Sequence, residues 1–119
     1  MRMKSFLLSI CPALLLSSSV LNATPQPQPE RVEITAKRFT FTPDQVTLKR
    51  GQPVVIVLES ADVSHGLQFR ELGINIKAGK GKTAEVPFTP TKAGDFTGQC
   101  SVFCGSGHGR MKFVLHVVE

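Results

Sequence analysis

The run Val54-Val55-Ile56-Val57-Leu58 decides the fold of this chain. All five residues are apolar and four of them are β-branched, which is typical of a strand that is buried on both faces. Gly51 interrupts the chain just before the run and marks its start. We therefore expect a central strand of a sheet at residues 54–58.

On both sides of this run, short segments that favour strands alternate with turns rich in Gly and Pro. No segment has a helical periodicity, and the chain contains no internal repeat. Short strands at regular intervals between such turns predict an all-β domain, either a β-sandwich or a barrel. The expected strands are residues 31–41, 46–48, 54–58, 74–76, 83–88, 95–99 and 111–118.

The N-terminus predicts export. Arg2 and Lys4 precede an apolar run from Phe6 to Leu16, and small and polar residues lead up to Ala23. This is the pattern of a signal peptide, so we expect residues 1–23 to be removed and the protein to be periplasmic or secreted. The alternative is a retained membrane anchor, although the run is shorter than the ~20 apolar residues of a spanning helix. Membrane contact is expected only in that case.

The rest of the chain is predicted to be one domain behind a tether. Residues 24–30, TPQPQPE, form a Pro-rich extended linker, and residues 31–119 form the domain. The whole chain has 14 Lys and Arg against 9 Asp and Glu, a formal net charge of +5. Removal of Arg2 and Lys4 with the signal peptide reduces this excess to +3. No basic stripe is interleaved with aromatic residues, so we expect no nucleic-acid partner.

Two cysteines remain after Cys11 is removed, and they are four residues apart. In an oxidising compartment Cys100 and Cys104 could form a disulfide, and spacing alone leaves that alternative open. Their neighbours favour a metal site instead. The segment is Cys100-Ser-Val-Phe-Cys104-Gly-Ser-Gly-His108-Gly-Arg-Met111, with two thiolates, an imidazole and a thioether within twelve residues. Cys and Met are the soft ligands that select copper, and imidazole suits copper as well.

Three glycines and a distant histidine complete the predicted site. Gly105, Gly107 and Gly109 free the loop from Cβ hindrance, so that it can wrap its ligands around one point. His65 follows the central strand, and a loop there can meet the loop between the last two strands at one end of a sandwich. We therefore expect His65 to supply the second imidazole. His116 lies opposite the apolar face of the closing strand, and we expect it to be solvated and to have no role.

The metal loop resembles the CuA loop of two families of cupredoxin domains, cytochrome c oxidase subunit II and nitrous oxide reductase. The segments Gly94–Ser101 and Asp62–His65 are similar to the oxidase motifs, while Gly73-Ile74-Asn75 is more like the reductase. The resemblance extends over nearly all of residues 31–119. It implies a cupredoxin-like Greek-key β-sandwich or barrel.

The same resemblance implies a ligand set and a function. Cys100 and Cys104 would bridge two copper ions, and His65 and His108 would each bind one of them. Met111 and the carbonyl of Val102 would be weak outer ligands. In these families the copper pair shares one unpaired electron when oxidised and transfers electrons quickly. We therefore expect an exported electron carrier that is not itself an enzyme and takes no small-molecule substrate. Its redox partner is expected to be a c-type cytochrome or a terminal oxidase.

Departures from the family pattern keep other functions open. Val102 replaces the glutamate that usually lies between the two cysteines, and the chain lacks Trp and Tyr, through which electrons usually enter. One alternative is a copper delivery or storage protein that uses the same ligands. The other is a mononuclear blue-type cupredoxin that uses His65, Cys104, His108 and Met111 and leaves Cys100 free.

Overall fold

The computed structural model describes residues 19–25 and 28–119. Most of the predicted signal peptide, residues 1–23, lies outside this part of the chain, and so do two residues of the predicted linker. In the described residues, no helix combines the length and the apolar character that crossing a membrane requires.

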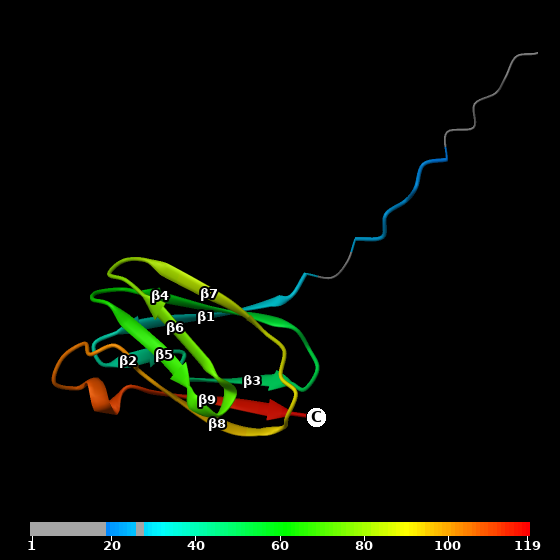
Figure 1. Cartoon of the computed structure of the whole chain (residues 1–119). Coiled ribbons are helices and arrows are strands. Elements are labelled where there is room, and N and C mark those ends of the chain that lie inside the picture. Colours follow the sequence, from blue (N-terminus) through cyan, green and yellow to red (C-terminus); the bar gives the residue numbers. More distant parts are fainter. Residues whose placement is uncertain (1–18, 26–27) are drawn as a thin grey trace, which may run out of the picture.

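Nine strands in the described part form two sheets that enclose the core between them (Figure 1). The predicted all-β sandwich is confirmed. One sheet has the order β2 (Thr40–Thr42), β1 (Glu30–Lys37), β4 (Val54–Ser60), β7 (Thr83–Phe88). The other has the order β3 (Gln45–Lys49), β9 (Lys112–Val118), β8 (Gly94–Gln99), β5 (His65–Phe69), β6 (Ile74–Ala78). Two short 3₁₀ turns, η1 (Arg70–Leu72) and η2 (His108–Arg110), complete the elements.

The predicted central strand is β4, which lies between β1 and β7. It pairs in parallel with β1 and antiparallel with β7. Val54, Ile56 and Leu58 are almost completely buried in the core, and Val57 on the other face is buried as well. Only Val55 is half-buried. Burial on both faces explains why this strand consists of a continuous apolar run.

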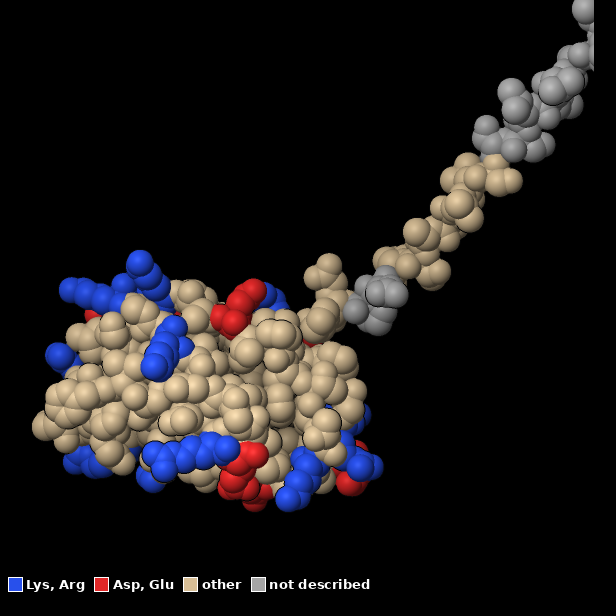
Figure 2. Space-filling model, in the orientation of Figure 1, with Lys and Arg blue, Asp and Glu red and all other residues tan. Residues whose placement is uncertain are grey.

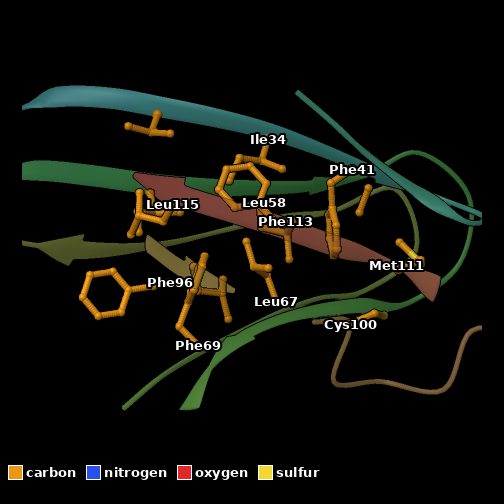
Figure 3. Close-up of a cluster of buried hydrophobic side chains, with 14 of the residues drawn as sticks. Ile34, Phe41, Leu58, Leu67, Phe69, Phe96, Cys100, Met111, Phe113 and Leu115 are labelled. Carbon is orange, nitrogen blue, oxygen red and sulfur yellow. The ribbon is translucent and has the colours of Figure 1, made fainter. Parts of the chain in front are cut away.

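The closing strand β9 supplies the opposite wall of the core. Phe113, Leu115 and Val117 point inward, as the alternation of the sequence predicts. The ring of Phe113 packs edge to face against Phe41 and Phe69, with ring centroids 6.3 and 6.0 Å apart (Figure 3). This is the preferred arrangement of aromatic pairs, and it joins the two sheets.

Charged side chains lie on the outside of the sandwich (Figure 2). His116, on the outer face of β9, is 33% exposed and contacts the carboxylate of Asp95 through Nδ1 at 2.6 Å and Gln45 Oε1 through Nε2 at 3.0 Å. The predicted place on the outer face of the closing strand is confirmed, although the side chain is only partly solvated.

Three strand predictions were wrong in detail. Residues 31–41 form two strands, because the chain turns back at Arg38 and Phe39 to bring Phe41 into the core. Strand β5 was not predicted, since Gly66 and Gln68 interrupt its apolar pattern, and His65 is its first residue instead of a loop residue. Strand β9 begins at Lys112, so Met111 belongs to the end of the preceding turn.

Candidate metal centre

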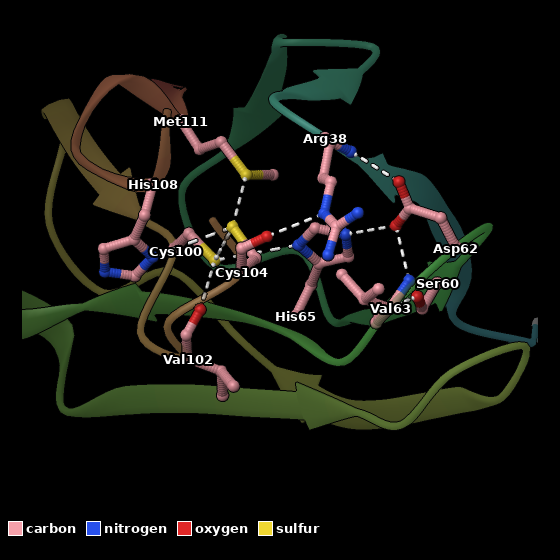
Figure 4. A network of polar contacts seen from close by, with 10 residues as sticks. All are labelled: Arg38, Ser60, Asp62, Val63, His65, Cys100, Val102, Cys104, His108 and Met111. Atoms are coloured by element: carbon pink, nitrogen blue, oxygen red, sulfur yellow. Dashed lines mark hydrogen bonds and ion pairs between the residues drawn. The ribbon is translucent and has the colours of Figure 1, made fainter. Parts of the chain in front are cut away.

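Four connections meet at one end of the sandwich, and we call this end the metal end. They are residues 38–39 between β1 and β2, 61–64 between β4 and β5, 79–82 between β6 and β7, and 100–111 between β8 and β9. The long loop 100–111 folds over this end and brings its donor groups against His65, which stands at the start of β5 (Figure 4). All six residues predicted as ligands lie here (Figure 4).

The strong donors form two pairs that share a centre. The Sγ atoms of Cys100 and Cys104 are 3.8 Å apart, and both thiols are free. Cys100 Sγ lies 3.9 Å from His65 Nδ1, and Cys104 Sγ lies 3.7 Å from His108 Nδ1. Each sulfur therefore faces its own imidazole and also the other sulfur.

Two weaker donors flank the sulfurs. Met111 Sδ lies 3.4 Å from Cys104 Sγ, and Met111 is only 1% exposed. The carbonyl oxygen of Val102 lies 3.2 Å from Cys100 Sγ and accepts its S–H in the metal-free protein. The two weak donors thus sit on different sulfurs, one beside each cysteine.

Asp62 fixes the orientation of His65. Its Oδ1 lies 2.6 Å from His65 Nε2, and His65 is completely buried. A carboxylate can only accept, so Nε2 carries the proton and Nδ1 is left with a free lone pair toward Cys100. Such a carboxylate behind a histidine is the usual outer support of a metal ligand. No role was predicted for Asp62, although its position three residues before His65 is a signal in the sequence.

The Asp62 carboxylate is held in its charged form. Burial alone would raise its pKa, but hydrogen bonds outweigh burial and lower the pKa of Asp62 from 3.8 to about 2. The donors are the backbone N–H of Arg38 at 2.8 Å from Oδ2, His65, and the backbone N–H of Val63 at 2.6 Å from Oδ1. The Asp62 carboxylate behind His65 therefore stays ionised at neutral and mildly acidic pH.

The β1–β2 turn holds the metal loop from the other side. The Nε of Arg38 donates to the carbonyl oxygen of Cys104 at 2.8 Å. The ring of Phe39 packs so closely on the loop that a Cβ on Gly107 would collide with it. Gly105 has a φ of +137° and also touches this ring, so glycine is required there for two reasons. Gly109 faces open space, and the structure gives no reason for glycine at that position.

The metal-free Cys104 thiol is protonated at neutral pH. Burial, a hydrogen bond with Cys100 and the charge of Cys100 raise the pKa of Cys104 from 9.0 to about 11. The guanidinium of Arg38 acts in the opposite direction and partly offsets this rise. A metal ion must therefore displace a proton from this sulfur when it binds.

The donor geometry fits metal ligation. In a tetrahedral site with metal–sulfur bonds of about 2.3 Å and metal–nitrogen bonds of about 2.1 Å, neighbouring ligand atoms are about 3.6–3.8 Å apart. The sulfur–sulfur and sulfur–nitrogen distances here are 3.7–3.9 Å. The ligand atoms of His65, Cys100 and Cys104 also lie within 4.8 Å of one another. Thiolate, thioether and imidazole donors in a buried pocket suit copper.

The fold and this soft donor set define a cupredoxin-like, copper-binding domain. Residues 24–118 match the family described as cytochrome C oxidase subunit II, periplasmic domain, and the chain belongs to that family. It is thus a copper-binding electron-transfer domain related to subunit II.

Individual relatives agree with this assignment. Two sequences of cytochrome c oxidase subunit 2 from Thermus thermophilus are each 28% identical to the chain over 93 residues. These matches cover 78% of this chain, but 69% of one relative and 55% of the other, so the chain spans only part of their length.

Solved structures share the fold. The periplasmic domain of subunit II of cytochrome oxidase from Bradyrhizobium japonicum superimposes with a TM-score of 0.70 at 23% identity, covering 78% of this chain and 87% of that one. The metal binding domain of the Streptococcus pneumoniae Cu(I) exporting P-type ATPase CopA superimposes with a TM-score of 0.64 at 25% identity, covering 82% of this chain and 93% of that one.

Proposed function

We propose that the domain is an electron carrier with a dinuclear copper centre of the CuA kind. The observation that carries the proposal is the pairing of donors, in which each cysteine sulfur has its own imidazole and both sulfurs lie together. Two bridging thiolates with one histidine for each ion use all four strong donors. His108 lies outside the group of ligand atoms that are within 4.8 Å of one another, which is His65, Cys100 and Cys104, so a single ion does not readily take all four strong donors.

The proposed ligands have separate tasks. Cys100 and Cys104 bridge the ions, while His65 and His108 each hold one of them. Met111 Sδ and the Val102 carbonyl are the weak outer ligands. When bound, the copper pair takes up and releases one electron. The chain contributes rigidity through β5, β9, Asp62 and the β1–β2 turn, and burial that keeps water from the sulfurs.

We infer a periplasmic or secreted carrier that exchanges electrons with a c-type cytochrome or a terminal oxidase. Membership of a family of periplasmic domains and the expected signal peptide, residues 1–23, support this location. The likeness to subunit II of oxidases supports a partner of the terminal-oxidase kind. By itself the domain would be no enzyme, because the chemistry proposed here is electron transfer.

Replacement of the bridging sulfurs tests the proposal. Cys100→Ser and Cys104→Ser should each abolish the dinuclear spectrum and lower the copper content, because a hydroxyl does not replace a bridging thiolate. The visible and EPR spectra of the copper-loaded protein, with copper analysis, give the readout. If Cys100→Ser leaves both unchanged, Cys100 is no ligand and the mononuclear alternative with His65, Cys104, His108 and Met111 gains support.

Copper delivery is the second candidate. The observation that favours it is the structural likeness to the CopA domain, which was solved with Cu(I). A delivery protein would release Cu(I) to a chelating acceptor within the time of mixing, whereas a carrier would retain copper through repeated oxidation and reduction. Measuring copper retention after many redox cycles separates these two functions.

A further inference from the structure

Positive charge is concentrated at the metal end of the domain. The four connections there contain Arg38, Lys80, Lys82 and Arg110 against Asp62. Two more carboxylates border them, Asp44 beside Arg110, and Glu71, together with Arg70, beside His108. The Asp62 carboxylate is already occupied by His65 and two backbone N–H groups. The metal end thus presents an excess of cations to an approaching molecule.

The opposite end of the sandwich is balanced. Two of its connections, residues 50–53 and 89–93, contain the basic residues Arg50 and Lys92. The first and last residues of the folded domain, Glu30 and Glu119, are acidic. Arg50 and Glu119 form an ion pair of 2.7 Å. In Figure 2 most of the acidic side chains in view lie over the half of the domain nearer the tether.

The metal loop also exposes an aromatic ring. Phe103 lies between the two cysteines of the metal loop and is 78% exposed. Its ring is inclined by 49° to that of His108, with centroids 5.6 Å apart. Aromatic residues that become buried on contact are common anchors of protein interfaces. Phe103 therefore offers an apolar contact directly beside a proposed copper ligand.

The described residues directly before β1 join the domain away from this face. The folded domain begins with Glu30 at the start of β1, and β1 runs from there toward the metal end, where Lys37 precedes Arg38. The preceding residues therefore join the domain at the end away from the metal loop (Figure 1).

We propose that the metal end is the docking surface for an acidic electron-carrier protein, with Phe103 as its apolar centre and Lys80, Lys82 and Arg110 as its rim. This rests on the proposed electron-transfer function. Opposite charges would steer the two proteins together, and Phe103 would be buried in the contact. One electron leaves one protein and enters the other, and no bond is made or broken.

Two charge-reversal variants with the same net charge test the proposal. Lys80→Glu with Lys82→Glu changes the metal end, and Lys49→Glu with Lys92→Glu changes exposed lysines at the opposite end. An acidic and a basic c-type cytochrome serve as probes, and affinity for the reduced, copper-loaded protein is measured by titration at low and high salt. We expect the acidic probe to bind more tightly, and the metal-end variant to weaken that binding about tenfold or more at low salt. The opposite-end variant should change it less than about twofold.

The variant Phe103→Ser tests the apolar contribution to binding. It should weaken binding of the acidic cytochrome at high salt as well as at low salt, while the copper spectrum stays unchanged. Tighter binding of the basic probe, or equal effects of the two charge variants, would overturn the proposal. A third result would also overturn it: the metal-end variant no longer binds phosphatidylglycerol vesicles but still binds the cytochrome as the unchanged protein does. The metal end would then be a membrane-binding surface. An unchanged copper spectrum in all variants keeps a failure of docking separate from a failure of the copper centre.

Discussion

Cys100 Sγ and Cys104 Sγ lie 3.8 Å apart, well beyond the ~2.05 Å of a disulfide bond. The two sulfurs face each other across the space that His65 and His108 approach from either side. The spacing of Cys100 and Cys104 in the sequence is compatible with a disulfide, but in the folded chain both thiols are free. The relationship between these two sulfurs is the basis of the proposed function.

Removal of the carboxylate behind His65 should weaken copper binding. Asp62→Ala leaves His65 Nε2 without its acceptor, so the ring loses its fixed orientation. We expect the copper affinity of Asp62→Ala, measured by competition with a chelator, to fall about 10–100-fold. The affinity of Asp62→Asn should lie between those of the unchanged protein and Asp62→Ala. Asp95→Ala is the matched control, since it removes the carboxylate partner of His116 outside the site. Equal losses in Asp62→Ala and Asp95→Ala would contradict this role of Asp62.

The two weak donors should respond to mutation in different ways. Met111→Leu removes a sulfur donor, so the protein should keep two coppers while its reduction potential rises, because the oxidised state loses a donor. Val102→Glu changes only the side chain and should leave the spectrum nearly intact, since the carbonyl is the proposed ligand. Voltammetry and visible spectra check both. An unchanged potential in Met111→Leu would make Met111 a plain core residue.

Arg38 should stabilise the metal loop through its side chain. Arg38→Met removes the donor to the Cys104 carbonyl but keeps the backbone N–H that binds Asp62. We expect a loss of about 1–3 kcal/mol in the free energy of unfolding, as for a hydrogen bond to a charged group, and a lower reduction potential because a nearby cation is lost. Arg110→Met removes an exposed cation of the same loop and serves as the control. If both variants shift the potential equally, the Cys104 contact is not the cause.

The copper-free protein should lose stability at high pH. The folded state raises the pKa of the Cys104 thiol from 9.0 to about 11, so folding favours the protonated thiol. This contribution is fully present below pH 9 and is lost as the pH rises toward 11, on the order of 2 kcal/mol. Urea unfolding of the copper-free protein between pH 8 and 11 measures it. In Cys104→Ala, the free energy of unfolding should fall much less between pH 8 and 11. If it falls as much as in the unchanged protein, another group causes the pH dependence.

Much of the fold was predictable because burial leaves a strong pattern. The run Val54–Leu58 and the alternation of Phe113, Leu115 and Val117 reflect the two walls of the core directly. Strand β5 was missed because it contains Gly66, which lies against Ser101 of the metal loop, a contact that no local pattern records. A residue selected for close packing against another segment carries little signal in its own neighbourhood.

The candidate site was predictable for a different reason. Four soft donors within one loop form an unusual composition, and His65 was the remaining histidine with a suitable position. Asp62, Arg38 and Phe39 were not predicted, since they act through contacts between the β1–β2 turn, the β4–β5 connection and the metal loop. Such contacts arise only when segments distant in the sequence are folded together.

Copper analysis and EPR of the copper-loaded domain test the central claim most directly. We expect two copper ions per chain and an oxidised form whose single unpaired electron couples equally to two copper nuclei. One copper per chain, with hyperfine coupling to a single nucleus, would contradict the dinuclear centre.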